Sequence, residues 1–183
     1  MFIRNKLESI QKINELCLNK FPEQLFKENE QDKVKEFLQM YPAKYYAIRD
    51  KSKAGGIFKL KVAYEDVLTE ILGYSLFTIN VSSANYVENQ LLVGEIEILS
   101  NGEVYATLSV APSASVRDAL KNPTFNLNTD IFDKKLNRIP YFDLIYQYII
   151  NNLQNVIVEF ALFNTEVGIK KQNIVVYELR THY

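Results

Sequence analysis

The chain has 183 residues and a formal net charge of −1, from 21 lysine and arginine residues and 22 aspartate and glutamate residues. A globular chain of this length buries roughly 70% of its unfolded surface, so it needs no disulfide or structural metal. The near-zero charge argues against binding nucleic acid over the whole surface and leaves a local basic patch open. One cysteine, Cys17, and one histidine, His182, argue against disulfide frameworks, thiolate zinc clusters and histidine-based nucleophilic enzymes.

Two amphipathic helices are expected first, over residues 5–18 and 30–40. Cys17 falls on the apolar stripe of the first helix, so we expect it in the core. No apolar run approaches the ~20 residues of a membrane helix. The N-terminus also lacks the apolar region of a signal peptide, so we expect a soluble, cytoplasmic protein.

The pattern changes to strands after Pro42. The clearest hairpin has an Asn-Gly turn at its tip, which suits a tight connection. A long segment over residues 111–138 is expected to be mostly loop. The other expected elements are strands over residues 44–49, 57–62, 77–81, 91–99, 104–110, 156–163 and 174–179, and helices over 64–72, 115–121 and 141–153.

Antiparallel hairpins mixed with helices indicate an α+β fold, with mixed or antiparallel sheets and flanking helices. We expect a single domain over residues 1–183 that has three parts. N-terminal helices occupy residues 1–42 and a first β lobe residues 43–110. A second lobe over residues 111–183 contains helix 141–153 and two closing strands.

A basic, glycine-containing loop joins the first two strands. Small residues let backbone N–H groups approach an anion, and cations neutralise it, so the loop suits phosphate. The alternative is an exposed hairpin with ordinary surface lysines, and the Walker pattern GxxxxGK[ST] is absent. The candidate residues are Arg49, Lys51, Lys53, Gly55, Gly56 and, on the next strand, Lys59.

Two glutamates interrupt the apolar closing strands. Glu159 lies within VIVEFALF and Glu178 within IVVYELR. A carboxylate in a core strand is costly unless it is paired or binds a metal, and oxygen ligands suit Mg²⁺. Each could instead face solvent or pair with Arg180 or a lysine. Glu95 and Glu97 lie two apart, so they share one face of their strand.

Read together, these segments resemble the ATP-grasp catalytic core over roughly residues 43–180. YYAIRDKSKAGGIFKLKV is similar to the cation-bearing strand and glycine-rich phosphate loop of that family. EDVLTEI and FTINVSSANYVE resemble the helix and strand that lead to the adenine hinge, and GEIEILSNGEVYATLS resembles the following hairpin. VEFAL and VVYELR occupy the places of the two strands that carry acidic metal ligands.

The resemblance implies a two-lobed core with ATP between the lobes, Arg49, Lys51 and Lys53 on the phosphates, and Mg²⁺ on Glu159 and Glu178. It implies an ATP- and Mg²⁺-dependent ligase or phosphotransferase. A small-molecule or peptide carboxylate would become an acylphosphate, which an amine then captures. Arg49 and Arg180 would assist catalysis.

The chain departs from the family pattern at several points. Arg49 stands where the family has a second phosphate lysine, and Arg180 stands where it has an asparagine. Within these 183 residues we expect no counterpart of the family's separate N-terminal substrate domain. The alternative function is a non-catalytic protein that binds nucleic acid or a protein partner through its basic, tyrosine-rich surface.

Overall fold

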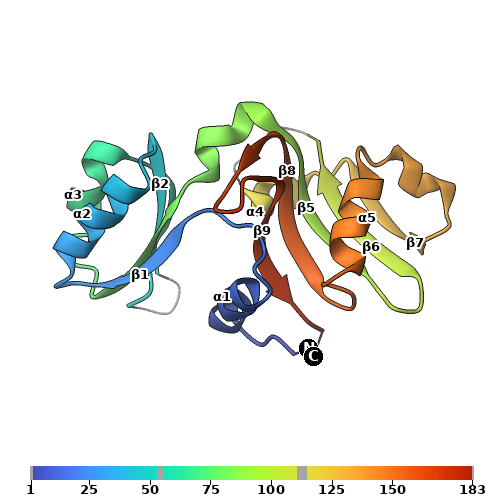
Figure 1. Cartoon of the computed structure of the whole chain (residues 1–183), viewed down its shortest axis with the longest axis horizontal. Helices are drawn as coiled ribbons and strands as arrows, with labels where there is room; N and C mark the ends of the chain where they lie inside the picture. Colours follow the sequence, from blue (N-terminus) through green and yellow to red (C-terminus); the bar gives the residue numbers. More distant parts are fainter. Residues whose placement is uncertain (1, 53–55, 111–114, 183) are drawn as a thin grey trace. The chain divides into compact units, whose positions relative to one another are not determined.

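The computed structural model describes residues 2–52, 56–110 and 115–182. The chain forms two compact units (Figure 1): a smaller unit, Phe21–Val87, and a larger unit that combines Met1–Lys20 with Glu88–Tyr183. Each unit has an antiparallel sheet with helices packed against it. The expected α+β fold class is therefore confirmed.

The smaller unit contains a four-stranded sheet in the order β1-β4-β2-β3, and every neighbouring pair is antiparallel. The elements are β1 (Glu23–Lys27), α2 (Gln31–Met40), β2 (Tyr45–Asp50), β3 (Phe58–Ala63), η1 (Tyr64–Asp66), α3 (Val67–Glu70), β4 (Leu76–Val81) and η2 (Ser83–Asn89). One 3-10 turn, η1, directly precedes helix α3, and a second one, η2, follows the last strand and leads out of the unit.

One face of this sheet is apolar, and α2 packs against it. The Phe26 ring of β1 lies 5.8 Å from both Phe37 of α2 and Phe77 of β4, and all three side chains are buried. Val67 of α3 is buried as well. Because side chains alternate along a strand, Arg49 of β2 lies on the face opposite the buried residues Tyr46 and Ile48.

The larger unit contains a five-stranded antiparallel sheet in the order β7-β6-β5-β8-β9. Its elements are α1 (Lys6–Glu15), β5 (Gln90–Ile98), β6 (Glu103–Ser109), α4 (Val116–Lys121), β7 (Phe125–Asp130), η3 (Lys134–Arg138), α5 (Phe142–Ile150), β8 (Ile157–Val167) and β9 (Gln172–Arg180).

The core of the larger unit lies on one face of that sheet, between the strands and helices α1 and α5. Alternate residues of β5 and β8 enter it, for example Ile96 and Val158, and so do Ile13 of α1 and Ile145 of α5. The residues between them along each strand point to the opposite face. Glu95 and Glu159 are therefore carried on the face that does not contain this core.

Several expectations differ from the structure. The β5–β6 hairpin pairs with β8, so the units do not follow the expected boundary between residues 110 and 111. Cys17 is exposed, because α1 ends at Glu15 and the backbone at Cys17 turns into the left-handed region with φ 51°. Strands β1 and β7 were not expected. Among the described residues, no helix combines the length and apolar character needed to cross a membrane.

Candidate functional site: a row of carboxylates on the larger sheet

Three glutamates form a row across three adjacent strands of the larger unit. Glu95 of β5 lies opposite Glu159 of β8, and Glu159 lies opposite Glu178 of β9. Directly opposite residues in a sheet point to the same face and have Cβ atoms about 5 Å apart. The three carboxylates therefore share one face, away from the apolar core.

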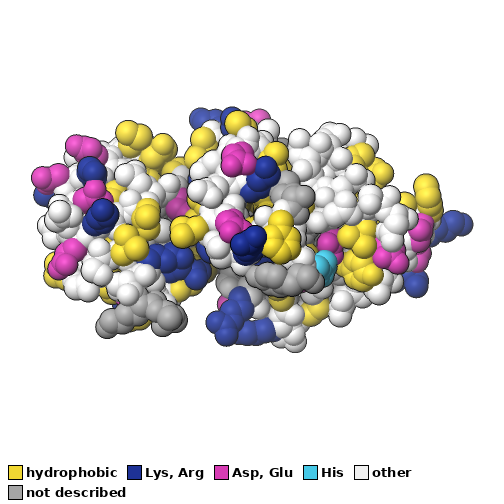
Figure 2. Space-filling view, turned by 90° about the horizontal axis from the view of Figure 1, so that it is seen from below, with side chains coloured by type: hydrophobic (Ala, Val, Ile, Leu, Met, Phe, Trp, Pro, Cys, Tyr) yellow, Lys and Arg dark blue, Asp and Glu magenta, His cyan; other side chains and the backbone are white. Residues whose placement is uncertain are grey.

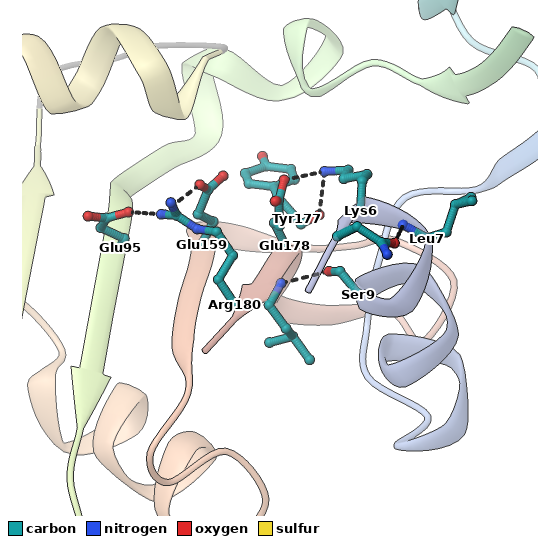
Figure 3. A network of polar contacts seen from close by, with 10 residues as sticks. Lys6, Leu7, Ser9, Glu95, Glu159, Tyr177, Glu178 and Arg180 are labelled. Carbon is teal, nitrogen blue, oxygen red and sulfur yellow. Dashed lines mark hydrogen bonds and ion pairs between the residues drawn. The ribbon is translucent and has the colours of Figure 1, made fainter. Parts of the chain in front are cut away.

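Two cations contact this row (Figure 3). Arg180 Nη2 contacts Glu95 and lies 3.1 Å from Glu159 Oε1. Lys6 Nζ, from the start of α1, lies 2.7 Å from Glu178 Oε2 and donates to the Tyr177 carbonyl oxygen at 3.3 Å. Three negative charges, if all are ionised, thus face two positive ones.

The central carboxylate has an unusual environment. Burial raises the pKa of Glu159, and the neighbouring charge of Glu178 raises it further, while Arg180 and Lys6 act in the opposite direction. Two carboxylates that crowd one another favour an added cation or a shared proton. The row is thus a place where positive charge is favoured.

The structure brings together three of the predicted site residues: Glu159, Glu178 and Arg180. The expected alternative of pairing with Arg180 or a lysine is realised for both glutamates. For Glu95, the sequence alone predicts only that it shares a strand face with Glu97. Its place opposite Glu159 depends on the pairing of β5 with β8, which no local sequence pattern signals.

The basic hairpin belongs to the smaller unit. The Arg49 guanidinium lies 4.4 Å from the centre of the Phe58 ring, its partner across β2 and β3. Lys59 Nζ forms an ion pair with Glu70 Oε2 of α3 at 2.7 Å. Lys51 follows β2 and donates its backbone N–H to the Leu76 carbonyl oxygen at 2.8 Å.

The glycines of the hairpin loop are only partly described. At Gly56, a Cβ atom would lie 2.5 Å from the Asp50 carbonyl oxygen, so the close approach of the two chain segments requires glycine there. Lys53 and Gly55 lie outside the described residues.

A hollow of about 400 Å³ lies within the larger unit, on the face that carries the carboxylate row. Glu97 lines it with a side chain that is 4% exposed and accepts a hydrogen bond from His182 Nε2 at 2.6 Å. Figure 2 shows the histidine, in cyan, at the surface beside acidic side chains. The other lining residues are Glu95, Ile96, Leu99, Tyr105, Thr107 and Ile157.

The side chains of the carboxylate row can be compared with the ligands that Mg²⁺ prefers. Within the part of the chain that the structure describes, no three His, Cys, Asp or Glu side chains are placed to hold a metal ion by themselves. Mg²⁺ commonly takes one or two carboxylates and completes its shell with water and phosphate oxygens. Glu159 and Glu178 thus fit a magnesium ion that arrives with phosphate, and they do not form a complete protein cage.

Comparison with known proteins bears on the fold. No protein-family model matches the sequence, and a comparison with curated proteins gives no match. Among solved structures, D-alanyl-alanine synthetase A from Vibrio cholerae matches with a TM-score of 0.50 and 16% identity, over 97% of this chain and 55% of that one.

Two further structures are similar at lower scores. The macrocyclase MdnC from Microcystis aeruginosa, bound with precursor peptide MdnA, has a TM-score of 0.48 and 14% identity, over 96% of this chain and 50% of that one. N5-carboxyaminoimidazole synthase from Aspergillus clavatus has a TM-score of 0.48 and 13% identity, over 98% of this chain and 45% of that one. The chain thus spans about half the length of these proteins. The arrangement of elements shared with the synthetase shows that the chain has an ATP-grasp-like fold.

Proposed function

We propose that this chain binds ATP with Mg²⁺ and transfers the γ-phosphoryl group to a carboxylate substrate, as a ligase or phosphotransferase of ATP-grasp type. One observation carries the proposal: Glu95, Glu159 and Glu178 line one face of three adjacent strands in an ATP-grasp-like fold. A half-buried carboxylate with a raised pKa beside other carboxylates is typical of a functional site.

Glu159 and Glu178 are the proposed magnesium ligands. When bound with ATP, Mg²⁺ would neutralise phosphate charge and hold the nucleotide in position. Arg180 and Lys6 form ion pairs with the same carboxylates. We infer that Arg180 moves away from Glu159 when the ion binds. The guanidinium group then donates hydrogen bonds to a phosphate oxygen, because its planar array of N–H groups matches the geometry of phosphate.

The smaller unit is proposed to supply cations to the phosphates. Arg49, Lys51 and Lys53 are assigned this role, together with Gly55 and Gly56 as further candidates. Lys59 is a less favourable candidate for binding phosphate, because its ammonium group is paired with Glu70. Arg49 is partly exposed and contacts Phe58 through its flat guanidinium face, so its N–H edge can donate to an anion.

The proposed reaction has two steps. A substrate carboxylate oxygen attacks the γ-phosphorus, the bond to the β,γ-bridging oxygen breaks, and ADP leaves with an acylphosphate formed. An amine nitrogen then attacks the acyl carbon, the bond to the phosphate oxygen breaks, and an amide and inorganic phosphate result. The protein contributes positioning and charge neutralisation, and Arg49 and Arg180 are the residues assigned to this role.

Thermal unfolding with millimolar MgATP tests the proposal. We expect the melting temperature of the wild type to rise by several degrees, because a ligand that binds only the folded state stabilises it. Glu159→Gln and Glu178→Gln should lose that rise. Glu166→Gln, an exposed glutamate on the same strand β8, is the matched control and should keep it. The proposal is wrong if wild type shows no rise with nucleotide.

A second function has its own supporting observation. Lys44 and Lys61 both lie over the Tyr45 ring, at 5.1 and 4.7 Å from its centre, so cations and aromatic rings are interleaved on this hairpin. Such surfaces suit single-stranded nucleic acid. A gel shift with single-stranded DNA at two salt concentrations tests this function. Steep salt dependence that weakens in a Lys44→Ala, Lys61→Ala variant would favour it over nucleotide chemistry.

A further inference from the structure

The hollow beside the carboxylate row is lined by acidic, aromatic and apolar side chains. Its polar lining includes the carboxylates of Glu95 and Glu97, which lie on one face of β5 because they are two residues apart. Thr107 and Tyr105 lie opposite them on β6, and Ile157 and Leu99 add apolar surface. Its volume of about 400 Å³ is in the range of small-molecule sites.

Glu97 is the distinctive member of this lining. Its side chain is 4% exposed, whereas the side chain of its partner His182 is 70% exposed. Among the residues that the structure describes, one imidazole nitrogen, from a residue that is itself mostly in solvent, is thus the hydrogen-bond partner of this nearly buried carboxylate. An ammonium group could replace that single contact with a full positive charge and up to three donors, which makes stronger hydrogen bonds to a carboxylate.

We propose that this hollow, here called the Glu97 pocket, binds a primary aliphatic amine in its ammonium form. The ammonium group contacts Glu97 in place of His182, and the aliphatic part lies against Leu99 and Ile157. An anionic ligand is disfavoured, because it would face two carboxylates.

The pocket also adjoins the proposed reaction site, because Glu95 belongs both to its lining and to the carboxylate row. The amine held there is the acceptor that captures the acylphosphate: its ammonium group passes one proton to the Glu97 carboxylate, and the neutral nitrogen attacks the acyl carbon. The carbon–oxygen bond to phosphate then breaks, and the departing phosphate takes the second nitrogen-bound proton as the amide forms. That assignment rests on the proposed function, whereas binding of the amine does not.

Chemical-shift titration of ¹⁵N-labelled protein with n-butylammonium tests the pocket, with n-butanol and butyrate as neutral and anionic probes of similar size. We expect saturable shifts at the Glu97, Thr107 and Ile157 amides with the ammonium probe, and at least tenfold weaker binding of the other two. Equal binding of butanol or butyrate would overturn the proposal, and this comparison needs no variant.

Two variants should change butylammonium binding in different ways. Glu97→Gln should weaken it at least tenfold, since the charge-assisted contact is lost. His182→Ala should keep or strengthen it, because the imidazole competes for the same oxygen, and a loss would contradict the assignment. Glu166→Gln, an exposed glutamate of β8 outside the pocket, is the control and should not change it.

The result is separable from the nucleotide proposal. Glu159→Gln should abolish stabilisation by MgATP and leave butylammonium binding within about twofold. Butylammonium binding in a wild type that shows no response to MgATP would support the pocket and remove the acceptor role. Nucleotide binding without selective amine binding would remove the pocket and leave the proposed nucleotide site.

Discussion

Glu95 and Glu159 lie directly opposite each other on neighbouring antiparallel strands, and one guanidinium group, that of Arg180, contacts both. Like charges directly opposite in a sheet destabilise it, so the arginine offsets a repulsion that the register creates. The same geometry allows another cation to take the place of arginine. The stability of this row and its capacity to bind a ligand therefore have one physical origin.

Removal of Arg180 should expose that repulsion. We expect Arg180→Ala to lower the free energy of unfolding by about 1–2 kcal/mol, a modest value because the pair is partly solvated. Urea unfolding at neutral pH measures it. Lys121→Ala, which breaks an exposed pair with Asp118, is the control and should cost about 0.5 kcal/mol or less. Equal losses in the two variants would contradict a special role for Arg180.

The raised pKa of Glu159 predicts in which direction the stability of the protein changes with pH. Because its pKa in the folded chain lies above the ordinary value of 4.5, the folded state binds more protons than the unfolded state between these two values. The contribution of this group to stability is therefore present at low pH and is lost as pH rises through the folded-state pKa.

Glu159→Gln removes this titration. The free energy of unfolding of the variant, relative to wild type, should accordingly increase as pH is raised from 4 to 7, measured by urea unfolding at each pH. Glu166→Gln should show no such trend, because that glutamate is exposed. A relative stability of Glu159→Gln that decreases with pH would mean that Arg180 and Lys6 dominate over burial.

A buried asparagine outside the row fixes the connection between β8 and β9. Asn19 is fully buried, and its Nδ2 donates to the carbonyl oxygens of Val167 and Ile174, both at 2.8 Å. Its Oδ1 accepts from the Lys170 backbone N–H at 2.8 Å. The two strands that carry Glu159 and Glu178 are thus tied to the segment after α1.

Asn19→Ala should lower the free energy of unfolding by about 2–4 kcal/mol, because several backbone groups lose their buried partner together. Thermal or urea unfolding measures the loss. Asn89→Ala removes an exposed hydrogen bond to Asn164 and serves as control, with an expected change within about 0.5 kcal/mol. A small effect at Asn19 would mean that water replaces the amide at this connection.

The sequence predicts the elements with strong periodicity and misses those whose identity depends on pairing. Strand β1 is five residues long with one buried side chain, Phe26, and it is a strand because it pairs with β4. Strand β7, FNLNTD, alternates as an edge strand does, but its asparagines and aspartate are typical of loops. In both cases a tertiary contact outweighs a weak local preference.

The residues of the candidate site also separate into those that a local sequence pattern predicts and those that only tertiary pairing brings into place. Glu159 and Glu178 could be singled out because a carboxylate within an apolar strand is costly, which is a local signal. Glu95 and Lys6 could not, because one depends on the register between β5 and β8 and the other on how α1 lies beside β9. The Glu97 pocket could not be predicted from the sequence for a similar reason, because His182 and Glu97, which are in contact, are 85 positions apart in the sequence.

Arg49 offers a test that separates ligand binding from folding. Its guanidinium is partly exposed and stacks on the exposed ring of Phe58, a contact worth about 0.5–1 kcal/mol at such a site. Arg49→Ala should therefore lower the free energy of unfolding by no more than about 1 kcal/mol. If the guanidinium also binds phosphate, its removal should weaken MgATP binding by at least tenfold, since a charge-assisted contact to an anion is lost.

Isothermal titration with MgATP measures the affinity, and urea unfolding measures the stability of the same preparations. Lys35→Ala removes a cation from the exposed side of α2, where it pairs with Asp32, and is expected to change neither quantity appreciably. An affinity loss equal in Arg49→Ala and Lys35→Ala would point to a general charge effect. A large loss of stability with unchanged affinity would assign Arg49 to the packing of the hairpin and leave the phosphate to other residues.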